Sequence, residues 1–350
     1  MSVRDWVSRR AGGVQRAVLL GSVVALWVCT PARARVGNVV FITFNTWNVN
    51  EPFQSRIDNA IEQLRTESPD VLGLEEIYLE GDGVAFRTDE RIASALHLDR
   101  VSHAAATVPL GSGTATEGLS LLSRYPIVSS TFLQLPSPNG GNGRIVLQGT
   151  ISTPFGLIDC YVTHLSTNSN ERDQQAQAAF AFIQSIPHVQ PPVLIGDFNA
   201  VPESLALLFL TGGISVNAQR GNLTEVWSAL YPGDPGPTFA TANAHGEPLD
   251  RRLDHVLVGV GSAAEPEGGR FVEAHRVLDQ ADPNGVFPSD HLGVSATLRF
   301  DGEPPPAAHG GGGCAVGRAP ADVRAAGLLF TACAGAVLLR RALRRRDRVV

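Results

Sequence analysis

The sequence predicts an α/β fold, a single domain in which strands and helices alternate. The first observation is a series of short apolar runs, rich in β-branched residues and bounded by proline or glycine, which is typical of buried strands. The second is three segments with apolar residues at helical spacing. The predicted strands cover 39–44, 70–74, 118–126, 145–152, 156–163, 193–195, 252–258 and 294–300, and the predicted helices cover 56–68, 89–98 and 171–186. Residues 212–237 show neither pattern and are predicted to be loops.

The composition is that of a globular protein, with 43% hydrophobic and 18% charged residues. Residues 36–303 carry 14 Arg against 31 Asp plus Glu, a net of −17, between two basic ends, and the chain contains no Lys. Such an acidic domain argues against tight electrostatic wrapping of nucleic acid. Cys160 is the single cysteine within 36–303, so no disulfide can form inside this domain.

The first 34 residues have the layout of a secretory signal peptide. Several Arg precede an apolar run over 17–29, and Ala32-Arg33-Ala34 is a small-residue cleavage site. We therefore assign 1–34 to a signal peptide and expect an exported protein that is extracellular, periplasmic or at the cell surface.

The C-terminal end is predicted to lie outside the folded domain. Residues 304–324 form a linker rich in Pro and Gly, and 325–350 combine a short apolar segment with an Arg cluster. The apolar segment has fifteen residues, which is short for a membrane span, since a span needs roughly 20. Two interpretations stay open. One is a single-pass membrane anchor, and the other is a sorting tail that resembles the MYXO-CTERM type of Gram-negative bacteria, processed around Cys314.

The third observation is that predicted strands end repeatedly in polar side chains. The run 193–195 is followed by Asp197 and Asn199, which share one face of an extended segment. A carboxylate there can orient or deprotonate a water, and an amide can donate to an anionic oxygen. A polar β-turn is the structural alternative for this pair.

The other strand ends carry residues of the same chemical kinds. They are Asn45, Glu75 and Glu76, His164, Asp254, and Asp290 with His291. Each has an ordinary structural interpretation when taken singly, but the repetition favours a common site. Carboxylates and an amide suit a hard divalent cation, and two imidazoles suit an anionic oxygen. Adjacent Glu75 and Glu76 point to opposite faces of a strand, so at most one faces the site.

In their order along the chain, these motifs resemble those of the endonuclease/exonuclease/phosphatase family. That family includes deoxyribonuclease I-like nucleases, abasic-site endonucleases, bacterial sphingomyelinases and inositol polyphosphate 5-phosphatases. The resemblance covers about residues 39–300. The matching motifs are Phe44-Asn45, Leu74-Glu75-Glu76, Thr163-His164-Leu165, Gly196-Asp197-Phe198-Asn199, Arg252-Leu253-Asp254 and Ser289-Asp290-His291.

The resemblance implies a deoxyribonuclease I-like, α+β arrangement: a four-layer sandwich of two mostly antiparallel β-sheets flanked by helices, with the site at one end. It also implies that Asn45, Glu76 and Asp290 hold Mg²⁺, with Mn²⁺ or Ca²⁺ as alternatives. In these proteins the metal neutralises the phosphate and the leaving oxygen.

The resemblance further implies five catalytic residues. Asp197 would orient or deprotonate the attacking water, and Asn199 and His164 would contact the phosphoryl group. Asp254 would hold His291 in one tautomer, so that the imidazolium stabilises developing charge or protonates the leaving group. The expected reaction is in-line hydrolysis of a phosphoester without a covalent intermediate.

Two positions depart from the family pattern. The family usually has Gln where this chain has Glu75, which either shifts metal affinity or faces away from the metal. His255 stands where an aromatic Tyr is common, which puts substrate contacts in doubt.

The resemblance leaves the substrate open between nucleic acid and a phospholipid such as sphingomyelin. Trp227 and Tyr231 could form a membrane-binding loop, although core packing is the usual role of such residues. Membrane contact is expected through the C-terminal segment, and no obligate protein partner is evident. The alternative function is a catalytically inactive, surface-anchored binding module. Because every motif residue is present, an enzyme is the better expectation.

Overall fold

The computed structural model of the protein describes residues 35–48, 50–81, 86–110, 112–138, 143–240 and 248–303. Within these ranges the chain forms two six-stranded sheets and a few helices. The strands are β1 (Arg35–Asn45), β2 (Val71–Gly81), β3 (Asp99–Leu110), β4 (Gly113–Ser123), β5 (Ile127–Gln134), β6 (Ile145–Thr153), β7 (Gly156–His164), β8 (Val193–Asp197), β9 (Thr224–Glu225), β10 (Asp254–Val258), β11 (Phe271–Val277) and β12 (Gly293–Gly302). The helices are α1 (Phe53–Glu67), α2 (Thr88–Leu96), α3 (Ser169–Gln184), α4 (Leu205–Leu210) and α5 (Val226–Leu230).

The two sheets have the same plan. Their strand orders are β11-β12-β1-β2-β4-β3 and β5-β6-β7-β8-β10-β9. Neighbouring strands are antiparallel except for β1 with β2 and β7 with β8. Each parallel pair is joined by a helix, α1 or α3, because parallel strands need a crossover connection. The predicted sandwich of mostly antiparallel sheets is confirmed.

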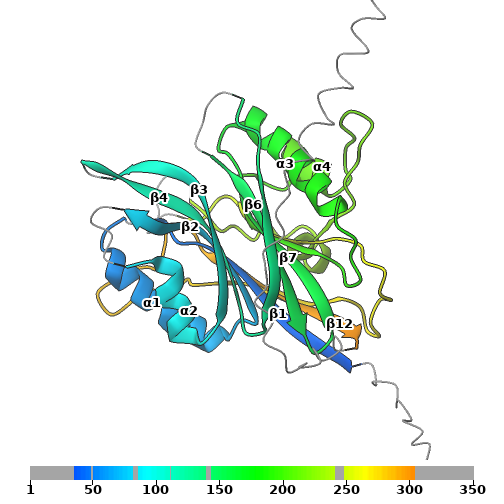
Figure 1. The fold of residues 1–350 in the computed structure, drawn as a ribbon, viewed down its shortest axis with the longest axis horizontal. Coiled ribbons are helices and arrows are strands. Elements are labelled where there is room, and N and C mark those ends of the chain that lie inside the picture. Colours follow the sequence, from blue (N-terminus) through cyan, green and yellow to red (C-terminus); the bar gives the residue numbers. More distant parts are fainter. Residues whose placement is uncertain are drawn as a thin grey trace, which may run out of the picture. The chain divides into compact units, whose positions relative to one another are not determined.

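Apolar side chains lie on both faces of the central strands. Phe41 on β1 packs into the layer between the sheets, together with Val162 and Ile195. Its neighbour Ile42 points the other way and packs against Ile57 of α1. Figure 1 shows α1 and α2 on the outer side of the first sheet and α3 and α4 beside the second. Burial on two faces explains why these strands are continuous apolar runs in the sequence.

The strands that sequence patterns missed lie at the edges of the sheets. Edge strands β3, β5 and β11 were not predicted, and the edge strand β9 and the helix α5 lie in a region predicted to be loops. Each predicted strand and helix is present, although several run longer than predicted. Phe132 and Val128 on β5 are 42% and 56% exposed, which illustrates why an edge strand lacks a clear apolar pattern.

A buried arginine, Arg56 on α1, joins the loop after β1 to the segment before β12. Its Nε donates to Asn50 O at 2.8 Å, and its Nη1 donates to Thr46 O at 2.9 Å and to Pro288 O at 2.8 Å. Its Nη2 donates to Asn48 O at 2.9 Å. Burial lowers the pKa of Arg56 to about 10, so the side chain stays charged at neutral pH. Backbone carbonyls therefore solvate this cation.

No helix in the described ranges is long and apolar enough to cross a membrane. The predicted signal peptide at 1–34, the linker from 304 and the segment 325–350 lie outside the residues that the structure describes.

Arg56→Met is expected to lower the free energy of unfolding by at least about 3 kcal/mol, because each buried carbonyl that loses its donor costs about 1–3 kcal/mol. Urea unfolding measures the loss. Arg65→Met is the matched control, since Arg65 lies on the same helix, is half exposed and pairs with Glu62 at the surface. The control is expected to change stability by less than about 1 kcal/mol. Similar small losses in both variants would contradict the role given to Arg56.

Candidate active site

Strand register brings the predicted polar residues to one end of both sheets. In the first sheet Asn45 on β1 lies opposite Glu75 on β2. In the second, Asp197 on β8 lies opposite His164 on β7 and Asp254 on β10. In the second sheet, the parallel strands β7 and β8 end side by side. The strand β10 runs antiparallel to β8, so the first residue of β10 lies beside the last residue of β8. The side chains converge because the register is fixed by the apolar faces.

Asn45 connects the two sheets at this end. Its Nδ2 donates to Asp197 Oδ2 at 3.0 Å and to Glu76 Oε1 at 3.2 Å. Its Oδ1 accepts from the Trp47 N–H at 3.0 Å. The side chain is fully buried. In this arrangement Asn45 holds two carboxylates in place as a hydrogen-bond donor, rather than turning its oxygen toward them.

The adjacent glutamates point in opposite directions, as predicted. The register of β2 against β4 shifts between Leu74 and Ile77, and Glu76 has a φ of 53°. This irregularity turns Glu76 toward the site, where Oε2 accepts from Asn48 Nδ2 at 2.8 Å. Burial raises the pKa of Glu76, and the negative charge of Asp197 adds to the effect. Glu76 is therefore a partly buried carboxylate that lacks a full counter-charge.

The Gly-Asp-Phe-Asn motif depends on its glycine. A Cβ on Gly196 would lie 1.9 Å from Thr163 O, so no other residue fits this approach of β8 to β7. Asp197, which follows, uses Oδ1 to accept the Asn199 N–H at 2.7 Å. Asn199 has a φ of 48°, a conformation that Asn tolerates better than most residues. The motif thus fixes the direction of both side chains.

His291 is held by a buried aspartate and carries a positive charge. Its Nδ1 donates to Asp254 Oδ2 at 2.9 Å, and Asp254 Oδ2 also accepts from Thr238 Oγ1 at 2.6 Å. His291 Nε2 lies 3.8 Å from Asp197 Oδ2. Burial of the ring opposes protonation, but the charges of Asp254 and Asp197 outweigh it and raise the pKa of His291 to about 10.

His164 has the opposite character. Its ring is buried, and the Arg144 Nη1 lies 2.6 Å from its Nδ1. Its Nε2 lies 3.5 Å from Asp197 Oδ2 and 3.0 Å from Asn199 Nδ2. Burial, the charge of Arg144 and the charge of His291 hold the pKa of His164 well below its usual value. The site therefore combines one imidazolium with one neutral imidazole.

The donor chemistry fits a hard divalent cation near Glu76 and Asp290. The pKa of Asp290 is raised to about 6: burial raises it most, the charge of His291 lowers it, and the charge of Glu76 raises it. Two carboxylates that both have raised pKa values are suited to a cation with oxygen preference. Asp197, Asp254 and His291 also place ligand atoms within 4.8 Å of one another. That second group is less suited to a metal, because the charges of Asp254 and Asp197 favour the protonated form of His291, which has no lone pair to offer a cation.

Sequence reasoning missed three polar residues that surround this site. Asn48 Nδ2 joins Glu76 Oε2 to Glu117 Oε2, at 2.8 and 3.2 Å. Arg144 Nη1 lies 3.8 Å from Glu117 Oε1. Two sequence signals could have found them. Glu117 is a lone carboxylate within β4, and Arg144 lies between a glycine-rich turn and β6. Neither belongs to a motif that the resemblance highlighted.

His255 is not a substrate contact. Its ring is fully buried, with Nε2 2.8 Å from Ala200 O and Nδ1 3.5 Å from Glu225 Oε1. The presence of His255 where Tyr is common therefore does not change a substrate contact. Trp227 is likewise buried in the core, with Tyr231 packed against that core, so core packing is confirmed for both aromatic residues.

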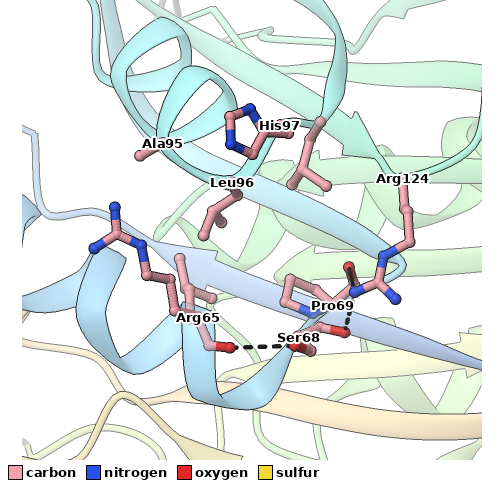
Figure 2. A pocket seen from close by; sticks show the side chains of 9 residues that line it. Arg65, Ser68, Pro69, Ala95, Leu96, His97 and Arg124 are labelled. Carbon is pink, nitrogen blue, oxygen red and sulfur yellow. Dashed lines mark hydrogen bonds between the residues drawn. The ribbon is translucent and has the colours of Figure 1, made fainter.

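A separate cavity of about 370 Å³ lies between the C-terminal ends of α1 and α2. Figure 2 shows Arg65, His97 and Arg124 around it, with Arg124 donating to Ser68 O at 2.9 Å. It opens beside the start of β2, whereas the site lies near Glu76, just after the parallel pairing of β2 with β1 ends. None of the predicted site residues lines it.

Glu75 faces the interior, away from the predicted metal ligands. It is fully buried, Oε1 accepts from Thr43 Oγ1 at 2.8 Å, and Oε2 has no hydrogen-bond partner among the described residues. Burial, followed by the charge of Asp254, raises the pKa of Glu75 well above its usual value. Of the two interpretations of this departure from Gln, the one in which Glu75 faces away is supported. A neutral carboxylic acid resembles an amide in shape and polarity.

Glu75→Gln is therefore expected to raise the free energy of unfolding above about pH 5, with a gain that grows as the pH rises. A carboxyl group with a raised pKa in the folded state keeps a proton that the unfolded chain has released, so stability falls with increasing pH. Urea unfolding between pH 5 and 8 in the presence of EDTA measures the gain. Glu62→Gln, at an exposed position of α1, is the control. A gain that stays constant with pH would contradict a neutral Glu75.

Known proteins share this arrangement of sheets. D. rerio TDP2 in complex with a single strand DNA product has a TM-score of 0.57 and 17% identity over 75% of this chain and 99% of that chain. An endonuclease/exonuclease/phosphatase from Beutenbergia cavernae has a TM-score of 0.56 and 22% identity, over 75% and 72%. The human Nocturnin catalytic domain with bound sulfate has a TM-score of 0.56 and 17% identity, over 76% and 96%. These likenesses establish the fold.

The sequence itself matches a model of the Endonuclease/Exonuclease/phosphatase family over residues 42–291. That range includes every strand-end residue described above, and it also includes Glu75 and His255, the two positions that depart from the family pattern. With the matching fold and most of the chain covered, this protein belongs to the endonuclease/exonuclease/phosphatase family.

Proposed function

We propose that this protein is a divalent-metal-dependent phosphodiesterase that hydrolyses nucleic acid by in-line attack of water. One observation carries the proposal. Asp197 Oδ2 lies between the Nε2 atoms of His164 and His291, at 3.5 and 3.8 Å, and these two rings differ in charge. The carboxylate can act as a base, the neutral imidazole as a hydrogen-bond donor and the charged imidazole as an acid, and all three lie close enough to act on one phosphate group.

In this mechanism Asp197 orients the attacking water and accepts its proton as the oxygen bonds to phosphorus. Asn199 and His164 donate to the phosphoryl oxygens. His291, oriented by Asp254, gives its proton to the leaving oxygen as the phosphorus–oxygen bond breaks, so protons balance at the end of the step. No covalent intermediate with the protein is required.

Carboxylate oxygens suit a hard cation such as Mg²⁺, and Glu76 and Asp290 would hold it. When bound, it would neutralise charge on the phosphate and on the leaving oxygen. Asn45, which donates to Glu76 and Asp197, would hold both the ligand carboxylate and the base in place.

Nucleic acid is favoured over lipid as the substrate for two reasons. The related TDP2 structure contains a single strand DNA product. The aromatic residues that could have formed a lipid-binding loop, Trp227 and Tyr231, pack in or against the core instead. The acidic domain, with a net of −17 over 36–303, makes short or single strands better candidates than duplex DNA.

The terminal sequences support activity outside the cytoplasm. Residues 1–34 have the order of charged, apolar and small residues that export signals use. We propose that the catalytic domain is exported and then either released or retained at the cell surface through 325–350.

With Mg²⁺, the purified protein is expected to degrade single-stranded DNA, and EDTA is expected to stop the reaction. Asp197→Ala and His291→Ala should each lower kcat by roughly 10²- to 10⁴-fold, because each removes a proton-transfer group. Glu62→Gln, at an exposed position of α1, should leave turnover unchanged. The readout is product release from single-stranded DNA, plasmid DNA and sphingomyelin vesicles assayed in parallel.

The assay has distinct outcomes. Headgroup release from sphingomyelin without DNA cleavage would replace the nuclease proposal by a lipid phosphodiesterase. Full activity in both alanine variants would overturn the site assignment. Inactivity on all phosphoesters would favour the binding module on the same fold.

A further inference from the structure

Arg144 is placed to act on His164 rather than on solvent. It precedes β6, and its side chain is 13% exposed. Nη1 lies 2.6 Å from His164 Nδ1, a short contact for two nitrogen atoms. A guanidinium has donors and no acceptor, so Nδ1 must be the acceptor of this hydrogen bond and cannot carry a hydrogen.

The neutral ring of His164 then has its hydrogen on Nε2. That atom faces the site, at 3.5 Å from Asp197 Oδ2 and 3.9 Å from Glu76 Oε1. The opposite tautomer would set an N–H of the ring against a charged N–H donor at 2.6 Å. Charge-assisted hydrogen bonds are shorter and stronger than neutral ones, so the contact with Arg144 decides the tautomer.

A second donor lies beside this N–H. Asn199 Nδ2 is 3.0 Å from His164 Nε2 and also donates to Leu165 O at 3.0 Å. The bond to Leu165 O fixes the amide with its nitrogen toward the ring. Two N–H groups therefore face each other without an acceptor between them, and an anionic oxygen that accepts from both would relieve this conflict.

Glu117 on β4 forms an ion pair with the Arg144 guanidinium. Its Oε1 lies 3.8 Å from Arg144 Nη1, and its Oε2 accepts from Asn48 Nδ2 at 3.2 Å. Glu117 is itself buried, and burial raises its pKa to about 7; in its ionised form it attracts Arg144 into this position rather than into solvent.

We propose that Arg144 is a positioning residue: by donating to Nδ1 it holds His164 in the Nε2–H tautomer, so that His164 and Asn199 present two donors to one phosphate oxygen. The proposal deepens the proposed hydrolase function and rests on it for its effect on catalysis. The tautomer itself does not depend on which substrate the protein uses.

The test is ¹⁵N NMR of the histidine side chains in the full chain, with His164 assigned by its absence in His164→Gln. The expected wild-type spectrum shows an unprotonated Nδ1 and a protonated Nε2. In Arg144→Met the protonated atom is expected to change, wholly or in part, to Nδ1, because Asn199 Nδ2 then becomes the donor to Nε2. Arg124→Met, at a half-exposed arginine of the other cavity, is the control and should leave the spectrum unchanged.

Kinetics separate positioning from direct binding. Arg144→Met is expected to lower kcat by roughly 10- to 100-fold with little change in KM, and Arg144→Lys, which keeps a cationic donor, should recover part of the loss. A protonated Nδ1 in the wild type, or an unchanged tautomer in Arg144→Met, would overturn the proposal. So would a rise in KM alone, which would make Arg144 a direct substrate ligand. Absence of turnover on every phosphoester would instead refute the hydrolase function while the NMR result stands.

Discussion

The buried guanidinium of Arg56 is the interaction on which the geometry of the site depends. It binds the carbonyls of the loop that follows Asn45 and the carbonyl of Pro288, just before Asp290 and His291. These two segments are distant in the sequence, yet they carry residues from both the predicted metal set and the catalytic set. Because a charged donor with several carbonyl partners has one favourable geometry, small movements of either segment are costly. The helix α1 thereby connects these two segments.

The two histidines differ in charge because their neighbours differ in charge. His291 faces the carboxylates of Asp254 and Asp197, which favour its proton. His164 faces the guanidinium of Arg144, whose positive charge disfavours protonation of the ring. Burial opposes the charged form of both rings, so it adds to one effect and competes with the other. One protein can therefore place an acid and a neutral donor within a few ångströms of a single carboxylate.

Whether a strand could be predicted from the sequence depended on how many of its faces are buried. Strands buried on both faces, such as β1 and β8, were visible as apolar runs, and the residues at their ends were found with them. The edge strands β3, β5 and β11 were missed because exposure removes the apolar signal. Arg144 and Glu117 were missed for a different reason: their role comes from contacts between strands, which no local pattern records. Glu75 was noticed, but only the structure shows that it faces the interior, where its Oε1 accepts from Thr43 Oγ1.

Crowding of carboxylates at the site has a cost for the fold. The pKa of Asp290 is raised to about 6 and that of Glu76 is raised as well. A carboxyl group with a raised folded pKa loses stability as the pH climbs from its unfolded to its folded pKa, so at neutral pH the full penalty of Asp290 is present. A cation that binds the folded state but not the unfolded chain would offset that penalty by mass action. The same unbalanced charge that weakens the isolated fold would favour binding of a divalent metal, which is the pattern expected where function overrides local stability.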